Sequence, residues 1–172
     1  MANTYTLISS NVLASSAASV TFSSIPSTYT DLVLRFSTRS DDAIVRSPFY
    51  VTVNGLTTTI YSYTQMTGIG AATASGRATS TTAWDYQGDG STATASTFSS
   101  AEIYIPNYAG TTQKPVSGNF VAENNSATSN VVAAQAGLAN LTSAITSISF
   151  VNQSTFNFVT GSSFYLYGIK NS

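Results

Sequence analysis

Apolar and polar residues alternate with a period of two along most of the chain. Such alternation, rich in Val, Ile, Thr, Tyr and Phe, is typical of strands that bury one face. The pattern is clearest around residues 20–22, 32–36, 49–53, 101–105 and 162–170, and weaker around 120–121, 131–134, 144–150 and 156–158. It predicts strands at all of these places and therefore an all-β protein.

The pair Asn54-Gly55 follows the apolar row at 49–53. Asn-Gly is favoured in type I′ turns because both central residues of that turn need a positive φ. The pair therefore predicts a tight turn that leads into a strand at 56–63.

Residues 64–98 differ from the rest of the chain. They are rich in Gly, Ala, Ser and Thr, and their few bulky side chains include Met66, Trp84 and Tyr86. Ordering a backbone costs about 1–2 kcal/mol per residue, and this stretch offers little apolar surface to offset that cost. We therefore predict a long inserted loop, projecting from the domain, that becomes ordered only against a partner.

The expected eight to ten short strands show neither βαβ alternation nor a repeat of fixed period. A two-sheet antiparallel sandwich of jelly-roll type accommodates them best. We expect residues 1–172 to form a single β-sandwich domain carrying the insertion at about 64–98. At 131–141 the frequent Ala residues are also compatible with a short helix, and the pattern does not decide between the two.

The composition restricts the kinds of partner. Charged residues make up 8% of the chain, six Lys and Arg against seven Asp and Glu, for a net charge of −1. So weak a field attracts neither a phosphate backbone nor an anionic bilayer, and no apolar run reaches the roughly 18 residues of a membrane span. We expect no nucleic-acid and no membrane partner, whereas copies that do not repel one another can pack densely.

The chain contains no His and no Cys. It therefore lacks the usual general base of a catalytic triad, a thiolate nucleophile, and sulfur or imidazole metal ligands. A glycosidase needs only two carboxyl groups flanking a bond, but no spacing singles out a pair among the seven acidic residues: Asp31, Asp41, Asp42, Asp85, Asp89, Glu102 and Glu123. We expect no enzyme activity, no catalytic residues and no cofactor.

Two features of the stretch 84–90 suggest a site. Residues 85–90 resemble a calcium loop, but they lack the EF-hand spacing and its closing Glu, so we interpret them as a solvated turn and expect no metal site. Exposed aromatic rings beside an acid can stack on sugars or fill a partner's pocket, which makes Trp84, Asp85 and Tyr86 the candidate partner contact. The alternative is that Trp84 folds back over the end of the sandwich.

The closing segment has apolar residues on both faces of its expected strand. Phe164 and Leu166 alternate with Tyr165, Tyr167 and Ile169. A sandwich strand needs only one apolar face, so we expect the second face to meet an insertion or another subunit of a homo-oligomer.

Four segments of the chain resemble small tailed-phage virion proteins with jelly-roll folds: SVTFSSIPSTYTDLVLRFSTRSD at 19–41, AEIYIPNYAGTTQKP at 101–115, AITSISF at 144–150 and SSFYLYGIK at 162–170. Proteins of this kind are capsid decoration (cement) proteins or tail and fibre components. Arg35, Arg39 and Lys170 match positions of this pattern, and we assign them no binding role.

The resemblance implies a protein of the virion, assembled in the host cytoplasm, and a homo-oligomer, often a trimer. Its partner would be the major capsid protein or another virion protein. We expect a non-enzymatic capsid decoration protein that stabilises the shell. The alternative is a tail-fibre or receptor-binding module that recognises host surface glycans.

Overall fold

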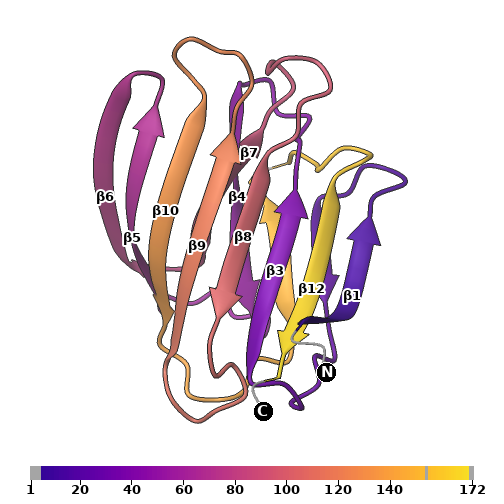
Figure 1. Ribbon diagram of the computed structural model, residues 1–172, viewed down its shortest axis with the longest axis vertical. Helices are drawn as coiled ribbons and strands as arrows, with labels where there is room; N and C mark the ends of the chain where they lie inside the picture. Colours follow the sequence, from indigo (N-terminus) through magenta and orange to yellow (C-terminus); the bar gives the residue numbers. More distant parts are fainter. Residues whose placement is uncertain (1–4, 154, 171–172) are drawn as a thin grey trace.

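The computed structural model describes residues 5–153 and 155–170, so residues 1–4, 154 and 171–172 of the expected domain lie outside the described part. The described residues form twelve strands and no helix (Figure 1). None of them belongs to a helix that is long and apolar enough to cross a membrane. The strands are β1 (Tyr5–Val12), β2 (Ser19–Phe22), β3 (Asp31–Ser37), β4 (Arg46–Val53), β5 (Tyr61–Ile69), β6 (Ala72–Thr81), β7 (Trp84–Asp89), β8 (Ser100–Ile105), β9 (Lys114–Ala122), β10 (Val131–Ala139), β11 (Ile148–Asn152) and β12 (Ser163–Ile169).

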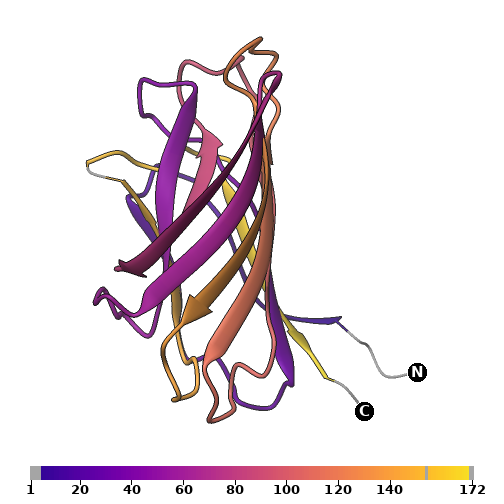
Figure 2. The ribbon, with the colours of Figure 1, turned by 90° about the vertical axis from the view of Figure 1, so that its left-hand side faces the viewer.

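The strands form two antiparallel sheets that pack as a sandwich (Figures 1 and 2). The smaller sheet has the order β2-β11-β4-β7, and the larger has the order β1-β12-β3-β8-β9-β10-β5-β6. Strands β1, β3, β8 and β12 of the larger sheet alternate along the chain with β2, β4, β7 and β11 of the smaller one, except that β4 and β7 of the smaller sheet follow one another in this series. This alternation is the jelly-roll arrangement, and the predicted fold class is confirmed.

Two hairpins extend the larger sheet beyond the jelly roll. The β5–β6 hairpin is inserted between β4 and β7, and the β9–β10 hairpin is inserted between β8 and β11. The region 131–141, which the pattern left open between helix and strand, is mainly β10, paired on one side with β9 and on the other with β5. Figure 2 shows β5 and β6 crossing obliquely in front of the sandwich, as the twist of a wide sheet requires.

The prediction of a long loop at 64–98 is wrong. The stretch contains most of β5 and all of β6 and β7. The low apolar content of the stretch does not prevent a strand here, because β6 is held by its backbone ladder with β5, from Ile69↔Ala72 to Tyr61↔Thr81. Its small side chains are largely exposed and contribute little burial. Residues 70–71 and 82–83 are short connections, and the one longer loop among the described residues of this stretch follows β7.

Arg39 orders this remaining loop at residues 90–99. Its two terminal guanidinium nitrogens donate hydrogen bonds to the backbone carbonyl oxygens of Ser91, Ala93, Thr94 and Thr97, at 2.8–3.1 Å. Charge-assisted hydrogen bonds to several carbonyls fix a loop that has few apolar contacts of its own. The role of Arg39 is therefore structural.

The turn at Asn54-Gly55 has the predicted backbone. Both residues have positive φ, 54° and 66°, and the Leu56 amide donates to the Val53 carbonyl at 2.9 Å. These are the features of a type I′ turn. The strands on either side do not form a hairpin, however, because β4 pairs with β7 and β11 whereas β5 pairs with β6 and β10. The chain crosses from one sheet to the other here.

A cluster of aromatic rings lies between the sheets. Phe36 of β3 lies at the centre, with ring centroids 5.7 Å from Phe49, 6.0 Å from Tyr86 and 4.9 Å from Phe150. Close, mostly edge-to-face contacts of this kind add to the burial of the rings themselves. The core packs against one face of the larger sheet, and the side chains of the opposite face point away from the core.

Candidate functional site

The structure does not support a partner contact at Trp84 and Tyr86. Both side chains are fully buried, and Trp84 packs edge-to-face on Tyr61 at 5.1 Å. Trp84 therefore packs inside the sandwich, which is closer to the alternative considered from the sequence. Asp85, between them on β7, is only partly buried because successive strand residues point to opposite faces.

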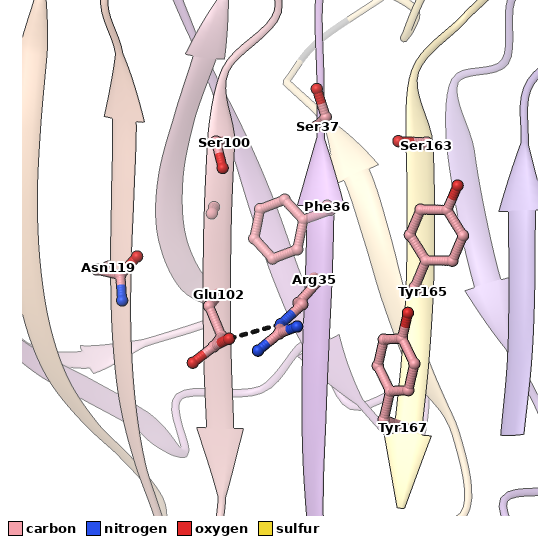
Figure 3. A pocket seen from close by; sticks show the side chains of 10 residues that line it. Arg35, Phe36, Ser37, Ser100, Glu102, Asn119, Ser163, Tyr165 and Tyr167 are labelled. Carbon is pink, nitrogen blue, oxygen red and sulfur yellow. Dashed lines mark hydrogen bonds and ion pairs between the residues drawn. The ribbon is translucent and has the colours of Figure 1, made fainter. Parts of the chain in front are cut away.

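A groove of about 460 Å³ lies on the outer face of the larger sheet (Figure 3). Its floor is a row of side chains in direct cross-strand register: Tyr165 of β12, Arg35 of β3, Glu102 of β8 and Asn119 of β9. The lining also includes Tyr167, Phe36, Ala101 and three serines: Ser37, Ser100 and Ser163. Four adjacent strands thus each contribute one polar side chain at the same height of the sheet.

Arg35 and Glu102 form an ion pair at the centre of the groove. The Arg35 Nε donates to the Glu102 Oε2 at 2.7 Å, as the dashed line in Figure 3 marks. This hydrogen bond raises the pKa of Arg35 above its ordinary value. The pair is largely solvent-exposed, so it adds little to stability, but it holds the guanidinium in one orientation.

Tyrosine rings form one wall of the groove. The Arg35 guanidinium lies 5.6 Å from the centroid of the Tyr5 ring and 6.0 Å from that of Tyr167. Tyr165 and Tyr167 stack on each other at 6.4 Å with an interplanar angle of 24°. Within the described chain, the second face of the closing strand is therefore partly covered by Tyr5 and Arg35.

The groove has the chemistry of a binding site. It presents hydrogen-bond donors and acceptors on a tyrosine wall, which suits a ligand with both hydroxyl groups and an apolar face. Among the described residues, Glu102 is the only acidic one that lines the groove, and it is already engaged by Arg35. Most glycoside hydrolases use two carboxyl groups about 5–9.5 Å apart. The described lining of this groove supplies one of them.

Apolar side chains surround this groove on the same outer face. Nine large apolar residues are exposed in the described part of the chain, and by strand register seven of them point from the outer face of the larger sheet: Tyr5, Leu7, Val12, Met66, Val121, Val132 and Leu138. The other two are Ile44 in a loop and Val151 on the smaller sheet. Exposed apolar residues gathered on one face, and not scattered, indicate an interaction surface.

Sequence reasoning missed the groove. Arg35 matched a position of the phage pattern but received no role, and Glu102 was treated only as one of seven acids. The available signal was the alternation itself, since Arg35 lies between Leu34 and Phe36 on a predicted strand and must point outward. The pairing that brings it beside Glu102 joins residues 67 positions apart.

No group of three or more acidic residues that could hold a metal ion occurs within 5–153 and 155–170. Residues 85–89 belong to β7, so the interpretation of 85–90 as a solvated turn is wrong.

No family model matches the chain, and no curated protein is significantly similar to it.

Proposed function

We propose that this protein is a non-enzymatic structural component of a phage virion. In this proposal it is a capsid decoration (cement) protein that binds the major capsid protein through the outer face of its larger sheet. The resemblance of four sequence segments to small phage virion proteins suggests the setting. The observation that supports attachment through this face is that seven exposed apolar residues lie together on it.

The dimensions of this face suit a stable interface. Eight strands spaced by about 4.8 Å, each about 20–30 Å long, give a face of roughly 700–1,000 Å². A stable interface buries roughly 800 Å² per partner, which is about a tenth of the 8222 Å² solvent-accessible surface of this molecule. Burial of apolar surface contributes about 25 cal/mol per Å² before the costs of association, so many attached copies would reinforce a shell.

The experiment measures attachment to virus particles that lack the protein. The double variant Val132→Ser with Leu138→Ser should lose attachment and the resulting protection of the particle against heat. Val151→Ser is the matched control, because Val151 and Leu138 are each 37% exposed but Val151 lies on the other sheet. Attachment that survives the double variant, or that Val151→Ser abolishes, refutes the use of this face.

The oligomeric state belongs to the same proposal. We expect a homo-oligomer, and the resemblance suggests a trimer. The two edges of the larger sheet provide pairing surfaces. Among the described residues, β1 pairs only with β12 and β6 only with β5, and the ten residues of β6 include one charged residue, Arg77. Light scattering should give a multiple of 17.9 kDa at micromolar concentration. A strictly monomeric mass contradicts this expectation.

The groove favours a second candidate function, recognition of host surface glycans by a tail-fibre or receptor-binding module. Hydroxyl groups of a sugar can bond to Arg35, Glu102 and Asn119 while its ring lies against the tyrosine wall. Binding to host polysaccharide should be lost in Glu102→Gln and retained in Arg77→Gln, which lies on the same face outside the groove. Copy number separates the two functions, since decoration needs hundreds of copies per virion and a fibre tip only tens.

A further inference from the structure

A second cleft, of about 350 Å³, lies away from the outer face of the larger sheet. Tyr50 of β4 and Asp85 of β7 are register partners on the outward side of the smaller sheet, and Tyr63 approaches them from β5. The last two residues of β6 and the bend at 82–83 also line it. The volume is at the small end of the roughly 300–1,000 Å³ typical of ligand pockets.

The Asp85 carboxyl in this cleft has no compensating partner among the residues that the structure describes. Its Oδ1 is buried and accepts no hydrogen bond from the described residues. Burial raises the pKa of Asp85 to about 6. Tyr63 lines the same cleft as Asp85. Burial raises the pKa of Tyr63, and the charge of Asp85 raises it further.

The neighbouring strands supply no cation to Asp85. The Arg46 Nη1 of β4 donates to the Gln87 Oε1 at 2.8 Å. Arg77 of β6 is in register with Thr64 and so lies on the opposite face of the β5–β6 hairpin. Gln135 of β10 donates its amide to the Asp85 backbone carbonyl at 2.9 Å and not to the carboxylate. The titratable groups that face Asp85 are thus Tyr50 and Tyr63.

A basic side chain supplies what this cleft lacks. An ammonium or guanidinium group would neutralise the carboxylate, donate hydrogen bonds to it and lie against the tyrosine rings, which attract cations through their π faces. A divalent metal ion requires several more oxygen ligands. A neutral sugar would leave the charge uncompensated.

We propose that the cleft formed by Tyr50, Tyr63 and Asp85 receives a lysine or arginine side chain of a partner protein. The site lies on a different face from the groove and the apolar surface described above. The proposal therefore goes beyond the proposed function and stands or falls independently of it.

The test follows amide chemical shifts while the whole protein is titrated with n-butylammonium chloride at constant ionic strength, with neutral n-butanol as the comparison. N-acetyl-arginine amide serves as a second cationic probe. Both cations should shift the resonances of Tyr63 and residues 80–85 saturably at pH 8, and butanol should not. At pH 5 about nine-tenths of Asp85 is protonated if its pKa is about 6, so the affinity should fall about tenfold.

Two variants isolate the carboxylate. Asp85→Asn keeps the shape of the side chain and should abolish both the binding and its pH dependence. Glu123→Gln removes the same charge at an exposed site on another part of the molecule and should change neither. Equal binding of butanol, binding that survives Asp85→Asn, or an affinity that is the same at pH 5 and pH 8 overturns the proposal. The pH comparison on the unaltered protein decides the question even if a variant fails to fold.

Discussion

Gly118 of β9 faces Tyr86 of β7 across the sandwich, and its replacement by alanine is expected to destabilise the protein. A Cβ atom at Gly118 would lie 2.4 Å from the Tyr86 hydroxyl oxygen and 3.2 Å from its Cε1 and Cζ atoms. The Tyr86 ring cannot easily move away, because the rings of Phe36, Phe49 and Phe120 surround it at 5.6–6.1 Å. Overpacking of this kind in a tight core costs about 1–3 kcal/mol.

Removal of the clashing atom should restore much of the loss. The Tyr86 hydroxyl is buried and has no hydrogen-bond partner among the described residues. An unsatisfied buried polar group costs about 1–3 kcal/mol, so Tyr86→Phe alone should be neutral or stabilising. In the double variant the shortest contact disappears, and the effect of Gly118→Ala should shrink by at least about 1 kcal/mol.

The assay is denaturant and thermal unfolding of the four proteins in this double-mutant cycle, followed by circular dichroism. For a chain of this length, 1 kcal/mol corresponds to about 2–4 °C in melting temperature. Gly76→Ala in β6 is the control, since a Cβ there would meet nothing closer than 3.9 Å, and it should be neutral or stabilising by up to about 1 kcal/mol. If Tyr86→Phe does not lessen the effect of Gly118→Ala, the two strands do not face each other as described.

Three further predictions concern the residues that the fold places unexpectedly. The raised pKa of Asp85 means that the folded state binds a proton more tightly than the unfolded state, so this group lowers stability as the pH rises from about 4 to about 6, by at most about 3 kcal/mol. Asp85→Asn should remove that dependence. The prediction is contradicted if the melting temperatures of the variant and of the unaltered protein change with pH by the same amount across this range. Deletion of residues 70–94 removes all of β6 and β7 and should unfold the protein, as circular dichroism would show; a folded deletion product means that these strands are dispensable. Arg39→Ala should leave the core intact but make residues 90–99 the first site of limited proteolysis, whereas an unchanged cleavage pattern argues against the ordering role of Arg39.

The inward faces of the strands were predictable from the sequence. Leu32, Leu34 and Phe36 are buried on β3, and Phe164 and Leu166 on β12, as their alternation with other residues predicted. Which face of a strand is buried depends on residues two positions apart, so a short window of sequence contains the information. The backbone of the Asn54-Gly55 turn is local in the same way, because it depends on which residues tolerate a positive φ.

The groove around Arg35 and Glu102 was only half predictable. The sequence shows that Arg35 points away from the core, but Glu102, Asn119 and Tyr165 become its neighbours through strand register alone. The same holds for the cleft at Asp85, where Tyr63 arrives from a strand of the other sheet. Register between distant strands follows from the topology of the whole sheet, which no local pattern specifies.

Only the tertiary structure decided the state of residues 64–98. Their composition argued correctly that most of the side chains bury little surface, and β6 is indeed largely exposed. The backbone of β6 is nevertheless paired with β5, and Trp84 and Tyr86 of β7 are buried between the sheets. Whether such a segment is a loop or a strand depends on where its backbone hydrogen bonds find partners, and those partners are contributed by other parts of the fold.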